Sequence, residues 1–128
     1  MKLFRRLICT LTAVVALLAG TVATASTASA ASGECAYNDG GQLCAQAYGN
    51  GYSVWFTNQS GTTKHLDFNL QCDNGARYGD EGDFWSYPGN RNSYFFGVGY
   101  QGNCHLRMYD YGTGRWYGSN SGYGYYNF

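Results

Sequence analysis

Hydrophobic and polar residues alternate without exception along the segment from His65 to Cys72. Its even positions are Leu, Phe, Leu and Cys, and its odd positions are His, Asp, Asn and Gln. Alternation with a period of two predicts a β-strand that buries one of its faces. Cys72 falls on the buried face, so we expect the residue to which it bonds to lie in the core as well.

Weaker alternation predicts further strands before and after this one. Tyr52, Val54 and Phe56 share a phase, and Tyr94, Phe96, Val98 and Tyr100 repeat the pattern later in the chain. Glycine-rich turn sequences separate the segments, which favours short strands joined by tight connections. The expected strands are two weak ones within 33–51, broken by Asn38-Asp39-Gly40-Gly41, and one each within 52–58, 84–87, 93–100, 103–110 and 115–117.

Loop lengths predict two antiparallel hairpins among these strands. Directly opposed residues on neighbouring strands point to the same face, so the number of residues in the connecting loop fixes which side chains can face each other. The five-residue loop 59–63 and the three-residue loop 101–103 both keep apolar residues together. The expected opposed residues are Val54 and Phe56 with Phe68 and Leu66, and Tyr100, Val98 and Phe96 with Cys104, Leu106 and Met108.

The second hairpin gives Cys104 the inward phase of Cys72, which predicts a disulfide between them. The remaining pair, Cys35 and Cys44, flanks the turn in the first strand pair and would close a loop of about ten residues. The chain-entropy model assigns about 2.5–3 kcal/mol to the short loop and about 3.5–4 kcal/mol to the long one. No Cys-x-x-Cys spacing is present, which disfavours a zinc or thioredoxin-like redox site.

The first thirty residues have the composition of a secretory signal peptide. Lys2, Arg5 and Arg6 precede an almost wholly apolar run, and Ala28-Ser29-Ala30 has the small residues of a cleavage site. We therefore expect residues 1–30 to be removed on export and the protein to act outside the cell. Four cysteines then remain in the mature chain, an even number that suits two disulfides in a secreted protein.

The mature chain is small, uncharged over long stretches and rich in aromatic residues. All 13 Tyr and 3 Trp lie in it, together with five basic and eight acidic residues, which give a net charge of −3. This charge argues against nucleic acid or an anionic membrane as the partner. We expect one domain at 31–117, an all-β antiparallel sandwich or flattened barrel of about seven short strands. Residues 118–128 would form a Gly/Tyr-rich tail or an edge strand of a monomeric protein.

The titratable residues do not match any common catalytic pattern. His65 and His105 are expected on outward faces, and no serine or cysteine nucleophile motif accompanies them. Asp73, Asp80 and Asp83 offer oxygen ligands of the kind that calcium prefers, but their spacing differs from that of an EF-hand loop. We therefore expect a protein that is not an enzyme and has no cofactor, with calcium binding in this acidic loop as a minor alternative.

Aromatic residues outside the core phase are the strongest indication of function. Trp55, Phe95, Tyr109 and Trp116 fall on the phase opposite the core or outside the clear strands. Exposed rings of this size can stack on sugars or anchor a protein interface, and the alternative is that they pack on a second sheet face. The first hypothesis is a secreted binding module for extracellular polysaccharide or cell-wall material. A protein-binding factor, such as a hydrolase inhibitor or an antimicrobial protein, and a structural surface protein are the alternatives.

Overall fold

The computed structural model describes residues 33–120, which form an all-β domain of two antiparallel sheets. The all-β class and the antiparallel pairing expected from alternation are confirmed, with nine strands in place of about seven. The strands are β1 (Glu34–Asn38), β2 (Gly41–Tyr48), β3 (Gly51–Asn58), β4 (Lys64–Cys72), β5 (Arg77–Gly79), β6 (Phe84–Ser86), β7 (Arg91–Phe96), β8 (Cys104–Asp110) and β9 (Arg115–Gly118).

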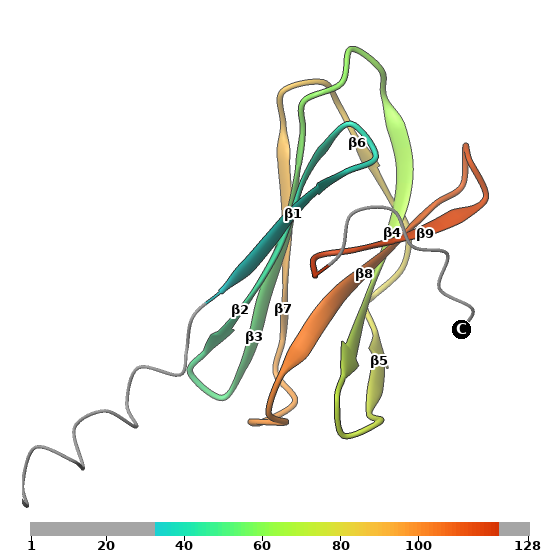
Figure 1. Ribbon diagram of the computed structural model, residues 1–128. Coiled ribbons are helices and arrows are strands. Elements are labelled where there is room, and N and C mark those ends of the chain that lie inside the picture. The colour runs from blue at the N-terminus through green and yellow to red at the C-terminus, as the bar shows by residue number, and fades with distance from the viewer. Residues whose placement is uncertain (1–32, 121–128) are drawn as a thin grey trace, which may run out of the picture. The chain divides into compact units, whose positions relative to one another are not determined.

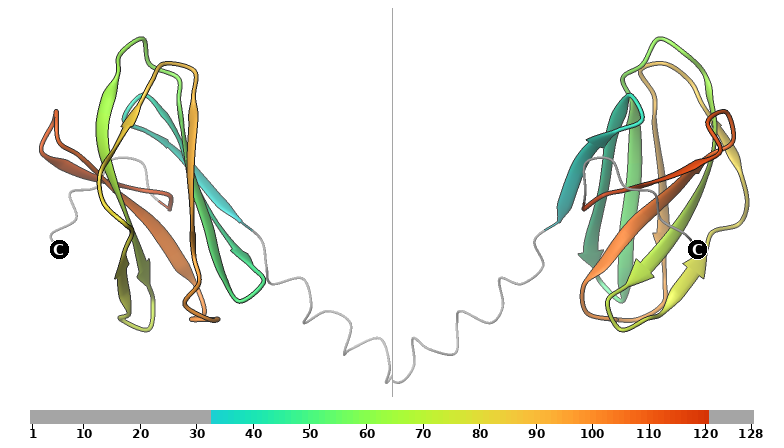
Figure 2. Two further views of the ribbon diagram at one scale, coloured as in Figure 1. Left: turned by 180° about the vertical axis from the view of Figure 1, so that it is seen from behind. Right: turned by 45° about the vertical axis from the view of Figure 1, so that its right-hand side comes forward.

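The two sheets face each other as the layers of a sandwich (Figures 1 and 2). One has four strands in the order β1-β2-β3-β7, and the other has five, with β5-β4-β8-β9 in order and β6 also paired with β4. Strand β6 pairs with the first part of β4 and β5 with its last part, so the two short strands lie along the same edge of β4. Strand β4 is therefore covered by neighbours on both edges along most of its length.

The inner faces of the sheets carry the apolar phase that the sequence predicts. Along β4, Leu66, Phe68, Leu70 and Cys72 are buried and the residues between them are partly exposed. The same alternation is present in β3 and in most of β8. The core consists of the buried residues Leu43, Ala45, Tyr52, Val54, Phe56, Leu66, Phe68, Leu70, Cys72, Phe96, Cys104, Leu106, Met108 and Tyr117.

Neither of the two expected hairpins is present. Strand β3 pairs with β2 and β7, and β4 pairs with β5, β6 and β8, so the loop 59–63 crosses from one sheet to the other. The chain likewise crosses between β7 and β8, and Phe68, not Phe96, lies opposite Met108. Two residues that face each other across the core of a sandwich both point inward. Two opposed residues on neighbouring strands of one sheet can also both point inward. The alternation pattern therefore fits both arrangements.

Both predicted disulfides are confirmed. Cys35 bonds to Cys44 and Cys72 bonds to Cys104. Each pair occupies directly opposed positions on neighbouring strands, β1 with β2 and β4 with β8. The bridges therefore join strands within a sheet and do not connect the two sheets, and such bonds are compatible with an extracellular protein.

The predicted signal peptide and most of the predicted tail lie outside the described residues. The structure describes neither 1–32 nor 121–128, so the segment 1–30 stays a prediction. Gly118 and Ser119 are described, and both are buried beside β8, where Ser119 N donates to Leu106 O. A search of the described part of the chain finds no helix long and apolar enough to span a membrane.

Candidate binding site

Three rings form a stack on the outer face of the five-stranded sheet. Trp85 on β6 lies directly opposite His65 on β4, and their ring centroids are 4.5 Å apart with nearly parallel planes. Tyr111, which follows β8, covers the other face of the imidazole at 4.3 Å. Trp85 and Tyr111 remain 54% and 49% exposed, so the stack presents aromatic surface to solvent.

The stack continues across the sheet through two further rings. Tyr109 on β8 meets the ring of Tyr111 edge to face, at 4.9 Å between centroids. Trp116 on β9 lies directly opposite Tyr109, and their centroids are 5.1 Å apart. We call the five side chains Trp85, His65, Tyr111, Tyr109 and Trp116 the aromatic row. It crosses the neighbouring strands β6, β4, β8 and β9 without a break.

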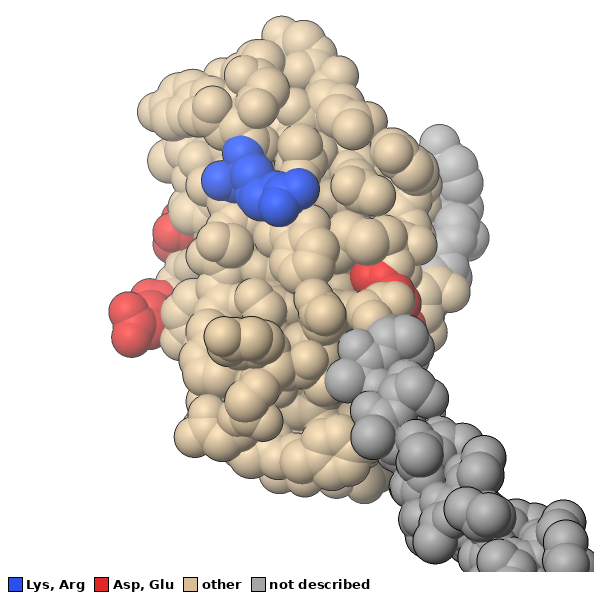
Figure 3. Space-filling model, turned by 90° about the vertical axis from the view of Figure 1, so that its left-hand side faces the viewer, with Lys and Arg blue, Asp and Glu red and all other residues tan. Residues whose placement is uncertain are grey.

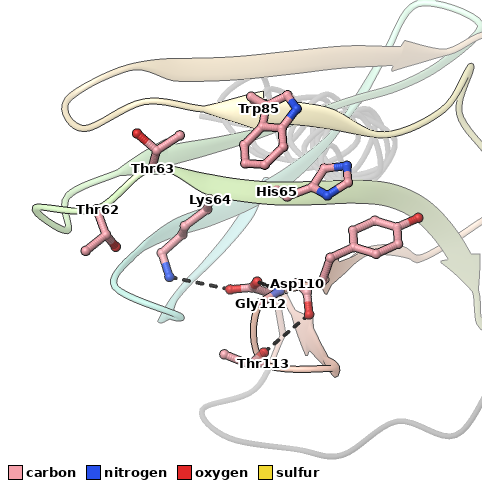
Figure 4. A pocket seen from close by; sticks show the side chains of 9 residues that line it. Thr62, Thr63, Lys64, His65, Trp85, Asp110, Gly112 and Thr113 are labelled. Atoms are coloured by element: carbon pink, nitrogen blue, oxygen red, sulfur yellow. Dashed lines mark hydrogen bonds and ion pairs between the residues drawn. The ribbon is translucent and has the colours of Figure 1, made fainter.

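A pocket of about 400 Å³ opens beside the aromatic row (Figure 4). Trp85, His65 and Tyr111 line it together with Lys64 and Asp110. Threonine side chains from the β3–β4 loop and from the β8–β9 turn add hydroxyl groups to its rim. The pocket thus combines aromatic surface with hydrogen-bonding groups; its remaining lining residues are Thr62, Thr63, Gly112 and Thr113.

Three carboxylates lie close to the middle of the row. Asp67 is directly opposite Tyr109 on the outer face, and its carboxyl is paired with that of Asp80. Burial, followed by the hydrogen bond and the charge of Asp80 and by the charge of Asp83, raises the pKa of Asp67 to about 6. Asp83 is hydrogen-bonded to His65 Nε2, which lowers the pKa of the Asp83 carboxyl. The surroundings of the row are therefore acidic.

A second charged cluster includes two residues that line the pocket, Lys64 and Asp110. Lys64 Nζ is 3.1 Å from Asp39 Oδ1 and 3.5 Å from Asp110 Oδ2, and all three side chains are largely buried. Burial and the neighbouring carboxyl of Asp110 raise the pKa of Asp39 to about 7. Burial opposes ionisation of Asp110 too, but its hydrogen bonds to Asp39 and Gly112 and the charge of Lys64 leave its pKa lowered. The cluster therefore places a largely buried lysine between two carboxyls, of which Asp39 has a raised pKa and Asp110 a lowered one.

The turn between β1 and β2 brings Asp39 into this cluster. Asp39 and Gly40 both have positive φ, 54° and 75°, as the two central residues of a tight hairpin turn do when the strands twist normally. Sequence analysis identified the turn but gave no indication that Asp39 would meet Lys64. The partners come from three segments that are distant in sequence, so spacing alone cannot reveal them.

The structure brings two of the four predicted binding residues together. Tyr109 and Trp116 belong to the aromatic row, whereas Trp55 and Phe95 lie on the outer face of the other sheet, on β3 and β7. Figure 3 shows the side of the molecule on which that sheet lies, and the visible surface carries few charged groups. The four residues therefore do not form one surface.

Trp55 has structural neighbours that account for much of its surface. It lies directly opposite Cys44, whose side chain shares its outward phase and is only 1% exposed. The guanidinium of Arg91 lies 5.4 Å from the centre of the indole ring. Trp55 Nε1 is buried and has no hydrogen-bond partner among the described residues. These features indicate that Trp55 covers the Cys35–Cys44 disulfide.

The calcium candidates of the acidic loop have different neighbours. Asp73 lies 2.8 Å from His105 Nε2, whereas Asp80 and Asp83 lie beside Asp67 and His65. Residues 33–120 contain no group of three or more His, Cys, Asp or Glu side chains arranged to hold a metal ion. The structure thus gives the calcium hypothesis no support.

The sequence pattern gave no indication that His65, Trp85 and Tyr111 belong to one site. The outward phase of His65 and the short strand containing Trp85 were both expected. No pattern in 73–83, however, predicts that β6 pairs with β4 or in which register. Tyr111 lies beyond the alternating part of β8. Comparison of the chain with protein-family models, characterised proteins and solved structures found no match.

Proposed function

We propose that the chain is a secreted, non-catalytic binding module for extracellular polysaccharide or cell-wall material. The observation that carries the proposal is the unbroken series of ring contacts from Trp85 through His65, Tyr111 and Tyr109 to Trp116. Aromatic rings supply large, rigid surfaces that pack against the apolar faces of sugar rings. A row of five rings across four strands suits a polymer better than a single small molecule.

The pocket beside the row supports the same conclusion. Sugar recognition requires polar groups that bond hydroxyls in addition to a surface for stacking. Thr62, Thr63 and Thr113 place hydroxyl-bearing side chains on the pocket rim, next to Trp85 and Tyr111. One sugar unit would pack against the rings while its neighbour in the chain meets the threonines.

Retention on insoluble glycans tests the proposal. The mature protein should be retained on at least one of chitin, cellulose and peptidoglycan. Trp85→Ala and Tyr111→Ala should each weaken retention about tenfold, the loss of roughly 1.4 kcal/mol that a stacking contact provides. Tyr37→Ala is the matched control, since Tyr37 is 67% exposed but lies on β1 of the other sheet. Absence of retention on every glycan would overturn the proposal.

Export is part of the proposal and has its own test. Two disulfides suit an oxidising compartment, and residues 1–30 have the composition of a cleaved signal. Mass spectrometry of the culture medium should find a chain that begins near Ala31. A full-length chain that stays in the cytoplasm would contradict it.

A protein-binding role is the second candidate because of exposed rings at one end of the four-stranded sheet. Tyr48, Phe95 and Tyr100 are 70%, 44% and 71% exposed. They gather near the β2–β3 turn, where Gly99 N donates to Asn50 O. A secreted hydrolase mixed with the protein should then form a complex that Tyr48→Ser and Phe95→Ser abolish. Full activity of every tested enzyme, with no complex by light scattering, would count against this role.

A further inference from the structure

The aromatic row is bordered by negative charge, which restricts the kind of glycan that fits it. Asp67, Asp80 and Asp83 lie beside its central rings, and the charges of Asp67 and Asp83 also help raise the pKa of the Tyr111 hydroxyl, after desolvation. Lys64, the basic residue of the adjoining pocket, is engaged by Asp39 and Asp110. The imidazole of His65 is engaged by Asp83 and enclosed by two rings.

The pair Asp67 and Asp80 lies at the outer face of β4. Asp67 is directly opposite Tyr109, and Asp80 N donates to Phe68 O at 3.3 Å, which holds Asp80 beside β4. The charges of Asp80 and Asp83 both raise the pKa of Asp67. Two ionised carboxyls this close repel each other. A ligand ammonium placed between them would remove this repulsion.

We propose that the aromatic row binds an amino-sugar polymer with free, protonated amines, such as deacetylated chitin. The inference rests on the proposed function and adds the charge of the ligand to it. Each sugar ring would stack on the row, and its ammonium would donate hydrogen bonds to Asp67 and Asp80. Ammonium groups also interact favourably with the faces of Trp and Tyr rings, so stacking and charge recognition reinforce each other.

An extended amino-sugar chain fits these observations better than a lysine-rich peptide does. The rings form a continuous strip from β6 to β9, and the threonines at one end offer partners for hydroxyl groups. A lysine side chain presents neither a flat face nor hydroxyls. Neutral glycans such as chitin and cellulose would use the rings but leave the carboxyl pair without a partner.

Calorimetric titration with two soluble hexasaccharides provides the test. One is fully acetylated and the other fully deacetylated, so they differ only in charge and acetyl groups. The mature protein should bind the deacetylated form at least tenfold more tightly, and added salt should reduce this preference because it screens the charges. The double variant Asp67→Asn/Asp80→Asn should bind both forms about equally, whereas Asp73→Asn, an exposed acid at the other end of β4, should behave like the wild type.

Each contrary result has a distinct meaning. Equal affinity of the wild type for the two hexasaccharides would overturn the inference and leave the proposed function standing. An unchanged preference in Asp67→Asn/Asp80→Asn, with native stability, would also overturn it. Poly-lysine that binds as tightly as the deacetylated hexasaccharide would overturn the inference too, because charge alone would then be recognised. No binding of any glycan would remove the proposed function itself.

Discussion

The Cα atoms of Cys72 and Cys104 lie 3.9 Å apart, on directly opposed positions of β4 and β8. Both side chains are buried in the core, 3% and 8% exposed. The bridge therefore joins the two longest-paired strands of the five-stranded sheet at one end, while the opposite end of the same strands carries His65 and Tyr109. The geometry of the aromatic row depends on this pairing remaining in register.

Removal of the Cys72–Cys104 bridge should destabilise the domain more than removal of the other bridge. The first spans a sequence separation of 32 residues and the second, Cys35–Cys44, only 9. The chain-entropy model gives a difference of roughly 1 kcal/mol, and the core cavity left by two alanines adds to it. Urea unfolding of Cys72→Ala/Cys104→Ala and Cys35→Ala/Cys44→Ala measures both. A larger loss in the second variant would contradict the prediction.

Alternation predicted which residues face the core but not which strands are neighbours. Phe56 and Leu66 are both inward, as expected, yet they belong to different sheets. An inward residue points at the facing sheet in either case, whether the next strand in sequence pairs with its own strand or belongs to the other sheet. The Cys72–Cys104 bridge was predictable nonetheless because both cysteines have the inward phase, and Cys35 and Cys44 were the remaining pair, which flanks a turn.

Stability should fall as pH rises between about 4 and 7. Burial raises the pKa of Asp39 from 3.8 to about 7, so over this range the folded state binds more protons than the unfolded state. A single group changes the free energy of unfolding by at most about 1.4 kcal/mol per pH unit. The pKa of Asp67, raised to about 6, also makes stability fall as pH rises. The lowered pKa of Asp110 changes stability only below this pH range.

Thermal unfolding across that pH range checks the sign. Asp39→Asn cannot titrate, so its melting temperature should vary less with pH than that of the wild type. Glu81→Gln is the control, since Glu81 is exposed in the segment before β6 and its substitution should leave the slope unchanged. A wild-type protein that becomes steadily more stable from pH 4 to 7 would show that other groups dominate.

The candidate site was only partly predictable because its residues are brought together by the pairing register of neighbouring strands. Tyr109 and Trp116 were identified because they fall on the phase opposite the core or outside the clear strands, and both belong to the row. Trp85 joins them because β6 pairs with the start of β4 and places its indole opposite His65. The segment before β6 is polar and glycine-rich, and such a segment allows many registers. Only the three-dimensional pairing shows the three rings together.

Trp55→Ala should lower stability and leave glycan binding unchanged. Trp55 lies opposite Cys44 on the outer face of the four-stranded sheet, and the guanidinium of Arg91 lies 5.4 Å from the centre of its ring. Truncation of a half-buried tryptophan is expected to cost about 2 kcal/mol. Trp116→Ala gives the matched comparison, since it should weaken retention on the glycan. Loss of binding in Trp55→Ala at native stability would restore Trp55 as a ligand contact.

Asn58→Ala should be among the most destabilising polar substitutions in the domain. Asn58 is fully buried at the end of β3, and its Nδ2 donates to Thr62 O at 2.9 Å and Ser86 O at 3.0 Å. Its Oδ1 accepts hydrogen bonds from Ser60 N and Oγ. These bonds hold the loop that crosses between the sheets against the end of β6. Alanine leaves buried groups without partners, at about 2–4 kcal/mol in total.

Urea unfolding of Asn58→Ala, with Asn50→Ala as the control, measures this effect. Asn50 is exposed in the β2–β3 turn, and its substitution should change stability by less than about 0.5 kcal/mol. Asn58→Asp should be at least as damaging as alanine, because a carboxylate would face the carbonyl oxygens of Thr62 and Ser86 without a proton to donate. Since the crossing loop also carries Thr62 into the pocket, Asn58→Ala should weaken glycan binding as well. Native-like stability of Asn58→Ala would show that the crossing is fixed by apolar packing of the two sheets alone.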